Sequence, residues 1–243
     1  MFIKRLLDVF LSTFGLLFLS IPLLILMFLV WKQDGHSPFY IAPRVGKNKK
    51  LFNMIKLRSM IVDADKSGVD STSNNDNRIT KVGAFIRRFK FDELMQLWNV
   101  LTGDMSLVGP RPNVISDTNL YTDKEVILLS VKPGITDFSS IIFSDEGEIL
   151  EGRSDPDLTY NQLIRPWKSR LGLTYIKNRS NMLDIFLIFY TVIAIISKKR
   201  ALKWIESYLV KIEANPKLIK ICRRESDLYA FPPPGSDMIV QSR

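Results

Sequence analysis

A long uncharged run near the N-terminus dominates the hydrophobicity pattern. After the charges at Lys4, Arg5 and Asp8, residues 9–31 carry none, and about 20 apolar residues are enough to cross a bilayer. A cleaved signal peptide has a shorter apolar core followed by a small-residue cleavage site, and neither feature is present. The pattern therefore predicts a retained membrane anchor over residues 1–33.

The anchor has two compatible topologies. Basic residues flank it on both sides: Lys4 and Arg5 before it, and Lys32, Arg44, Lys47, Lys49 and Lys50 after it. The positive-inside rule places both flanks in the cytoplasm. Ser20 and Pro22 interrupt the middle, where a proline removes a backbone donor and a serine hydroxyl can satisfy the freed carbonyl. These residues favour a re-entrant helix kinked at Ser20 and Pro22, but a single-pass helix with an incidental proline fits them equally well.

The pattern changes after the anchor. Residues 39–57 contain two short runs rich in aromatic and branched side chains on either side of a turn signal at residues 46–49, which predicts a β-hairpin. The basic tip of this hairpin is expected either in solvent or against anionic lipid. Residues 63–78 are polar and lack periodicity. They predict a long loop, of the kind that often serves as a functional lid.

A helix is predicted from Asp92 to Leu101. Its apolar stripe consists of Leu94, Leu97, Trp98 and Leu101, at helical spacing. Gly103 is placed to end it.

Two adjacent carboxylates, Asp92 and Glu93, occupy the first turn of this predicted helix. Taken alone, the pair is best explained as an N-cap and a favoured first-turn acid.

Nearby arginines weaken that simple explanation. Arg87 and Arg88 lie about one turn before the pair, and Arg111 follows between Pro110 and Pro112, which restrict the backbone around it. Carboxylates beside fixed guanidinium groups form a site that can hold a divalent cation together with a phosphate. The sequence thus indicates a candidate site for a phosphorylated ligand.

Composition narrows the class of partner. Lys and Arg number 34 against 25 for Asp and Glu, a net charge of +9, which favours anionic partners: phosphates, nucleic acid or an anionic membrane leaflet. The single cysteine, Cys222, cannot form an internal disulfide, as expected in a reducing compartment. His36, the only histidine, lies in a connector, and no role in chemistry is expected for it. The Rossmann, P-loop and zinc-hydrolase motifs are absent.

Four stretches, in order, resemble the bacterial sugar transferase family, the small monotopic polyprenyl-phosphate phosphoglycosyl transferases. They are "KRLLDV", "SPFYIAPRVGKNKKLFNMIKLRSM", "VGAFIRRFKFDELMQLWNVLTGDMSLVGPRP" and "VKPGIT", within residues 3–196. The resemblance implies an α+β fold: a re-entrant membrane helix over residues 1–33, then a small cytoplasmic catalytic domain of helices with a short hairpin over residues 34–197. Residues 198–243 are expected to form a basic amphipathic extension. The implied location is the bacterial inner membrane, with the catalytic domain on the cytoplasmic face.

The resemblance also implies roles for the candidate residues. Asp92 corresponds to the family's nucleophile and Glu93 to its Mg²⁺ ligand, while Arg87 and Arg111 correspond to phosphate contacts, with Arg88 beside them. The implied reaction transfers a phosphosugar from a UDP-sugar to polyprenyl (undecaprenyl) phosphate through a covalent aspartyl intermediate, with release of UMP. It would be the first membrane step of a surface glycan. The implied partners are the UDP-sugar, polyprenyl phosphate and membrane lipids, with no nucleic acid; a homo-oligomer is left open.

The chain departs from the family pattern after "PGIT". Many members continue with Gly, then Trp or Leu, Ala and Gln, whereas this chain continues "DFSSIIFSDEGEIL". The family's sugar or uridine contacts in this segment are therefore not transferable. The acidic residues Asp145, Glu146 and Glu148 are expected to form a solvated turn rather than a second metal site. Residues 182–196 are too short to span a bilayer, and the closing "FPPPGSD" predicts an extended, exposed end.

Two other functions fit parts of the sequence. A glycosyltransferase that moves the sugar alone would release UDP instead of UMP. A non-enzymatic, membrane-tethered basic module could bind anionic lipid or nucleic acid, for which the net charge and the anchor suffice.

Overall fold

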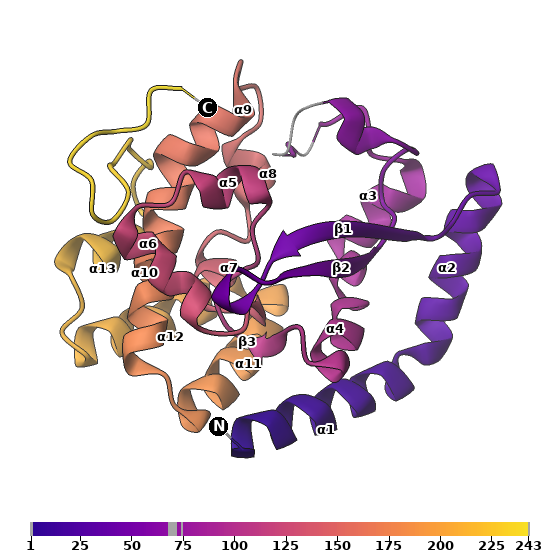
Figure 1. Cartoon of the computed structure of the whole chain (residues 1–243), viewed down its shortest axis with the longest axis horizontal. Coiled ribbons are helices and arrows are strands. Elements are labelled where there is room, and N and C mark those ends of the chain that lie inside the picture. The colour runs from indigo at the N-terminus through magenta and orange to yellow at the C-terminus, as the bar shows by residue number, and fades with distance from the viewer. Residues whose placement is uncertain (1, 68–71, 74, 243) are drawn as a thin grey trace.

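The computed structural model describes residues 2–67, 72–73 and 75–242. Within these residues helices predominate, together with one antiparallel hairpin and one short parallel strand pair (Figure 1). This agrees with the predicted class of helices around a small β-hairpin. The predicted polar loop over residues 63–78 lies partly outside the described residues; within them it holds a 3₁₀ turn at Ala64–Ser67.

The N-terminal segment forms two helices with a sharp bend between them. Helices α1 (Phe2–Phe18) and α2 (Ser20–Asp34) meet at 63°, and the Ser20 hydroxyl donates to the Leu17 carbonyl at 2.8 Å. Across the part of the chain that the structure describes, no single helix is long and apolar enough to cross a membrane; α1 and α2 reach that length and composition only as a bent pair. The bend lies where Ser20 and Pro22 predict it.

Three charged side chains at the start of α1 attach this arm to the body. Lys4 Nζ donates to Asp184 Oδ2 at 2.6 Å, Arg5 donates to the carbonyls of Val100 and Leu101 at 2.5 and 2.7 Å, and Asp8 Oδ1 accepts from Ser106 Oγ and the Leu107 amide at 3.1 and 3.0 Å. Because charged hydrogen bonds between partly buried groups are strong and directional, they fix α1 along the body. In Figure 1, α1 runs beneath the body and α2 rises along one side.

The predicted hairpin is confirmed. Strands β1 (Phe39–Val45) and β2 (Leu51–Leu57) pair antiparallel, with Phe39 opposite Leu57 and Val45 opposite Leu51. A 3₁₀ turn, Lys47–Lys49, joins them, and Asn48 adopts a φ of 56° there, in the left-handed region that asparagine tolerates better than most residues.

The helix predicted from Asp92 begins later. After α3 (Lys81–Arg88), the carboxylates occupy a 3₁₀ turn, Phe91–Glu93, and α4 (Gln96–Thr102) follows, ending at the left-handed Gly103 as expected. The predicted apolar stripe is partly wrong, because Trp98 is 52% exposed. The buried Asn99 instead connects α4 to β2. Its side-chain Oδ1 accepts from Ile55 N at 2.9 Å, and its Nδ2 donates to Asn53 O at 2.8 Å.

A close crossing of two backbones follows α4. Strands β3 (Ser106–Val108) and β4 (Gly134–Thr136) pair in parallel. A Cβ on Gly134 would lie only 2.0 Å from the Gly109 nitrogen, so this crossing requires glycine. It fixes the start of the "GPRP" segment that carries Arg111.

The remaining helices complete the body, whose main core includes the buried Trp167. They are α5 (Ile115–Asn119), α6 (Asp123–Val126), α7 (Phe138–Ile142), α8 (Glu146–Ile149), α9 (Pro156–Thr159), α10 (Arg165–Asn178), α11 (Asn181–Ile196), α12 (Lys198–Lys211) and α13 (Pro216–Arg223). A 3₁₀ turn, Ile127–Ser130, follows α6, and a π-helical turn, Tyr160–Ile164, joins α9 to α10. Ile205 of α12 and Ile221 of α13 are buried in the same core as Trp167, so the predicted C-terminal extension is packed on the catalytic body.

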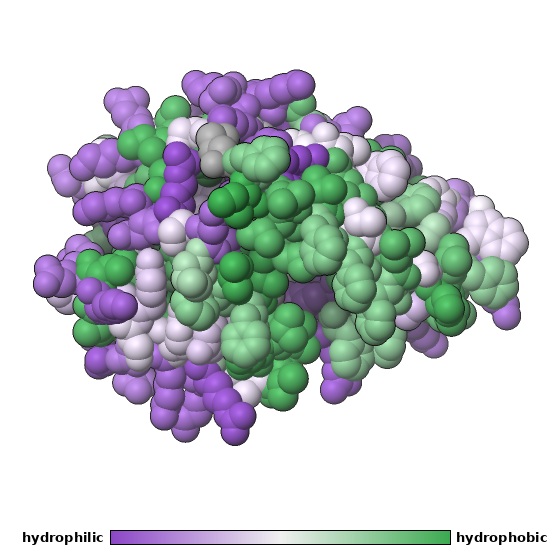
Figure 2. Space-filling view, turned by 90° about the horizontal axis from the view of Figure 1, so that it is seen from below, coloured by the Kyte–Doolittle hydropathy of each residue, from purple (hydrophilic) through white to green (hydrophobic). Residues whose placement is uncertain are grey.

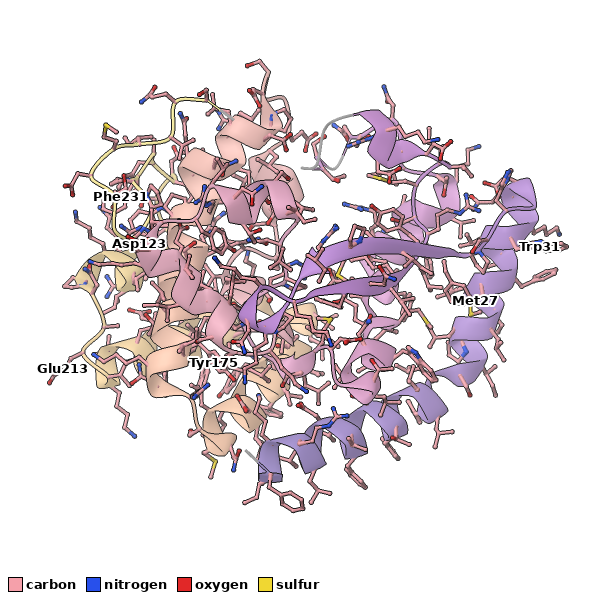
Figure 3. All side chains as sticks on the ribbon, in the orientation of Figure 1. Met27, Trp31, Asp123, Tyr175, Glu213 and Phe231 are labelled. Atoms are coloured by element: carbon pink, nitrogen blue, oxygen red, sulfur yellow. The ribbon has the colours of Figure 1, made fainter. Side chains whose placement is uncertain are left out.

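The C-terminal tail also packs on the body. Phe231 stacks on Trp167 with ring centres 4.5 Å apart, and Pro233 and Pro234 are buried. The exposed end predicted from the triple proline is confirmed only in part: the prolines are largely covered, whereas Gly235, Asp237, Met238, Gln241 and Ser242 are exposed. Figure 3 shows Phe231 in the tail on the side of the molecule opposite Trp31.

One face of the molecule is strongly apolar. Figure 2, which views the molecule from the side of α1 and α11, shows apolar side chains gathered into a continuous patch. Its exposed members on these helices include Phe10, Phe14, Leu17, Phe18, Ile185, Phe189, Val192, Ile195 and Ile196. Contiguous apolar patches of this kind mark membrane or protein contact surfaces.

Candidate active site

The two carboxylates lie at a sharp reversal between α3 and α4. Lys90, with a φ of 59°, turns the chain into the 3₁₀ turn Phe91–Glu93. Asp92 is only 6% exposed, and its Oδ1 makes no hydrogen bond to any residue that the structure describes. An N-cap aspartate would accept a helix amide, so the capping explanation of Asp92 is wrong.

Glu93, by contrast, is held by two cations. Arg111 Nη1 donates to Glu93 Oε2 at 3.3 Å, and Nη2 donates to Oε1. Lys56 Nζ also lies 3.5 Å from Glu93 Oε1. The arginine fork therefore binds the carboxylate through both of its oxygens, an arrangement that is stronger and more directional than a single bond.

Lys56 is a site residue that the sequence analysis missed. It lies on β2, and its Nζ is also 3.8 Å from Asp92 Oδ2. The available signal is its position in the strand: Met54 and Phe52, two and four residues earlier on the same face, are buried. A lysine that continues the buried face of a strand needs an anionic partner.

The same surroundings shift the two acids in opposite directions. Burial raises the pKa of Asp92, and the neighbouring Glu93 charge adds to this, while Lys56, Arg87 and Arg111 oppose it. Burial also acts to raise the pKa of Glu93, but Arg111 and Lys56 outweigh it and hold that pKa well below the usual range. Burial lowers the pKa of Lys56. The cations thus compensate Glu93 more fully than Asp92.

The three candidate arginines are not equivalent. Arg111 contacts Glu93 directly, and Arg87, which is half-buried, lies near enough to lower the pKa of Asp92. The Arg87 side chain makes no hydrogen bond or ion pair with the described part of the chain, so its donors remain for a ligand. Arg88 is exposed, with its guanidinium 5.7 Å from the centre of the Phe89 ring, and is not brought to the carboxylates.

The acidic turn after the "PGIT" departure is not merely solvated, as the sequence had suggested. Asp145 is paired with Lys198 at 2.8 Å and with Arg224 at 2.9 Å, while Glu146 is paired with Lys168. Among residues 2–67, 72–73 and 75–242, no cluster of three or more acidic, histidine or cysteine side chains is placed to bind a metal.

The oxygen ligands that Asp92 and Glu93 offer nevertheless fit one common kind of Mg²⁺ site. Mg²⁺ is commonly held by one or two carboxylates together with substrate phosphates and water. The pair offers adjacent carboxylates and a buried Asp92 Oδ1 without a partner among the described residues. The arrangement fits a cation that is shared with a bound diphosphate.

Comparisons with known proteins point to one family. The family model described as "Bacterial sugar transferase" matches residues 1–198. The chain is 33% identical to an uncharacterized sugar transferase of Haemophilus influenzae over 82% of this chain and 42% of that protein. It is 35% identical to the undecaprenyl-phosphate galactose phosphotransferase of Salmonella typhimurium over 78% of this chain and 40% of that protein.

A shorter relative matches this chain over most of the length of both proteins. The uncharacterized sugar transferase EpsL of Bacillus subtilis is 35% identical over 79% of this chain and 86% of its own length. The chain spans less than half the length of the Haemophilus and Salmonella proteins.

The pKa values of the two acids are shifted in opposite directions, so neutralising each acid should change the stability of the fold in opposite directions. Because the pKa of Asp92 is raised in the fold, its charged form costs stability above the unfolded pKa, and the cost disappears at lower pH. Asp92→Asn should therefore raise the thermal unfolding temperature of the detergent-purified protein at pH 7, with the difference shrinking toward pH 4. Glu93→Gln should lower stability at pH 7, by about 3 kcal/mol, since it breaks a buried ion pair. A destabilised Asp92→Asn variant at pH 7 would contradict this account.

Proposed function

The chain belongs to the bacterial sugar transferase family, and from that premise we propose that it transfers a phosphosugar from a UDP-sugar to polyprenyl phosphate, releasing UMP. The observation that carries the proposal is the state of Asp92, a buried carboxylate with one oxygen free of hydrogen bonds to the described residues and cations on several sides. The product, a polyprenyl-diphosphate-sugar, would start a surface glycan. Undecaprenyl phosphate appears in the names of relatives that act with galactose, glucose and N-acetylgalactosamine.

In the first step, an Asp92 carboxylate oxygen attacks the β-phosphorus of the UDP-sugar. The bond from that phosphorus to the bridging oxygen breaks, the electron pair leaves with UMP, and the phosphosugar remains on Asp92 as an acyl phosphate. In the second step, an oxygen of polyprenyl phosphate attacks the same phosphorus. Asp92 leaves as a carboxylate, and the lipid diphosphate forms.

The surrounding cations serve both steps. Lys56 is the charge that most strongly opposes the effect of burial on the pKa of Asp92, so it favours the ionised nucleophile at neutral pH. In this proposal Arg87 and Arg111 contact the non-bridging phosphate oxygens, whose charge they balance as the leaving group departs. Mg²⁺, with Glu93 as its proposed ligand, would supply further positive charge to the diphosphate.

We also propose that the protein is monotopic, in the bacterial inner membrane with its site on the cytoplasmic face. The 63° bend between α1 and α2 and the apolar face of α1 and α11 support this arrangement. Trp31, half-exposed on α2, points away from the body (Figure 3), as an interfacial anchor does. The arrangement keeps the site close to the lipid surface, where a long polyprenyl phosphate presents its head group.

The released nucleotide tests the reaction. The purified protein is incubated with undecaprenyl phosphate, Mg²⁺ and, in turn, UDP-galactose, UDP-glucose and UDP-N-acetylgalactosamine, and the nucleotides are separated by chromatography. We expect UMP, and a loss of roughly 1,000-fold or more in Asp92→Asn because the nucleophile is removed. Asp104→Asn, which alters a carboxylate beyond the other end of α4, is the matched control. Release of UDP would identify the alternative glycosyltransferase reaction, and full activity of Asp92→Asn would favour a non-enzymatic binding module.

Thiol labelling tests the topology. One variant carries a cysteine ahead of Met1 and another carries Ser37→Cys, and intact spheroplasts are treated with a membrane-impermeant maleimide. A re-entrant arm keeps both positions inside, so both should be labelled only after the membrane is opened. The buried Cys222 gives the background. Labelling of one position in intact cells would show a spanning helix instead.

A further inference from the structure

A second polar cluster lies within electrostatic range of Arg111. It consists of Glu146 on α8, Tyr160 in the π-helical turn and Lys168 on α10. Lys168 Nζ donates to Glu146 Oε2 and lies 5.2 Å from the centre of the Tyr160 ring.

The charge of Arg111 couples this cluster electrostatically to the catalytic pair. The charge of Arg111 acts on Glu93, on Glu146 and on Tyr160, and that of Lys90 acts on both Glu93 and Glu146. Burial would raise the pKa of Glu146, but Lys168 and Arg111 outweigh it and leave that pKa lowered. Glu146 is therefore an ionised hydrogen-bond acceptor at neutral pH, next to the arginine proposed to bind the diphosphate.

The two adjacent acids, Asp145 and Glu146, have different partners. Asp145 pairs with Lys198 and Arg224, two cations of the C-terminal segment, and so joins that segment to α8. Glu146 instead pairs with Lys168 and interacts with Arg111. Of the two acids, Glu146 is the one whose pKa the charge of Arg111 lowers.

Tyr160 lies in an irregular segment, the π-helical turn Tyr160–Ile164, and the C-terminal tail packs against this turn. π-Helical turns are rare and frequently occur at functional sites. The Gln162 carbonyl in this turn accepts from the Phe231 amide at 3.1 Å, and its side-chain amide donates to the Val240 carbonyl at 2.7 Å. The tail that provides these contacts lies outside the residues 1–198 that the family model matches.

We propose that Glu146, Tyr160 and Lys168 form a donor subsite that binds the hydroxyl groups of a ring in the UDP-sugar, either the sugar or the ribose. The inference rests on the proposed function. A carboxylate accepts hydrogen bonds from ring hydroxyls, an ammonium group donates to ring oxygens, and a tyrosine offers both an aromatic face and a hydroxyl. Glu146 lies in the stretch where the sequence leaves the family pattern, so it is suited to set this chain's donor preference.

Kinetics of two variants and a control test the subsite. KM, kcat and inhibition by UMP are measured for Glu146→Gln and Tyr160→Phe with UDP-galactose, UDP-glucose, UDP-N-acetylglucosamine and UDP-N-acetylgalactosamine. We expect the KM of the preferred donor to rise about tenfold or more in Glu146→Gln, since a charged hydrogen bond is lost, while kcat changes little. Asp145→Asn, the matched control, should keep the donor KM and preference of the parent.

The pattern of change identifies the ring. An altered preference among the donors with unchanged inhibition by UMP assigns the subsite to the sugar. Weaker inhibition by UMP with an unchanged preference assigns it to the ribose. Parent values for KM, preference and UMP inhibition in both Glu146→Gln and Tyr160→Phe would overturn the proposal.

Binding without turnover separates this inference from the proposed reaction. Thermal shifts with the same four UDP-sugars and with UMP are compared between Asp92→Asn and the double variant Asp92→Asn/Glu146→Gln. A smaller shift in the double variant supports the subsite even if the parent releases no UMP, a result that would defeat the proposed reaction alone. Equal shifts in the two proteins would count against the subsite.

Discussion

The unequal compensation of two adjacent buried carboxylates is the constraint around which this site is built. Glu93 receives the arginine fork of Arg111 and the ammonium of Lys56, whereas Asp92 Oδ1 has no hydrogen-bond partner among the described residues. A buried charge that is incompletely paired is costly. A protein is expected to retain such a cost only where the unpaired oxygen has a function. A nucleophile requires a free oxygen, whereas a structural acid does not.

Separate parts of the fold supply this environment. The hairpin brings Lys56, which Asn99 keeps in register with α4; α3 brings Arg87; and the glycine crossing of β3 and β4 sets the path to Arg111. The charges at the start of α1 bond to the end of α4, to β3 and to α11. The apolar face and the catalytic pair are therefore connected through the same few elements. This connection gives the site a fixed position relative to the surface proposed to meet the membrane.

The sequence predicted what depends on local pattern. The hairpin, the bend near Ser20 and Pro22 and the end of α4 at Gly103 follow from turn chemistry, proline and glycine, which act within a few residues. It did not predict contacts made across the fold. Lys56 joins the site only because β2 packs against α4, and the charges of Asp145 and Glu146 find partners on helices that are distant in sequence. Trp98 is exposed because α4 buries Asn99 to bind the hairpin, a tertiary requirement that helical periodicity cannot show.

The central claim is that Asp92 becomes covalently attached to the phosphosugar. Mass spectrometry of the purified protein after incubation with UDP-sugars and Mg²⁺, without lipid, tests this directly. The account predicts an added phosphosugar that maps to Asp92, is absent from Asp92→Asn and is discharged by polyprenyl phosphate. If no donor gives an adduct, yet lipid product forms once polyprenyl phosphate is added, transfer is direct and Asp92 is not the nucleophile.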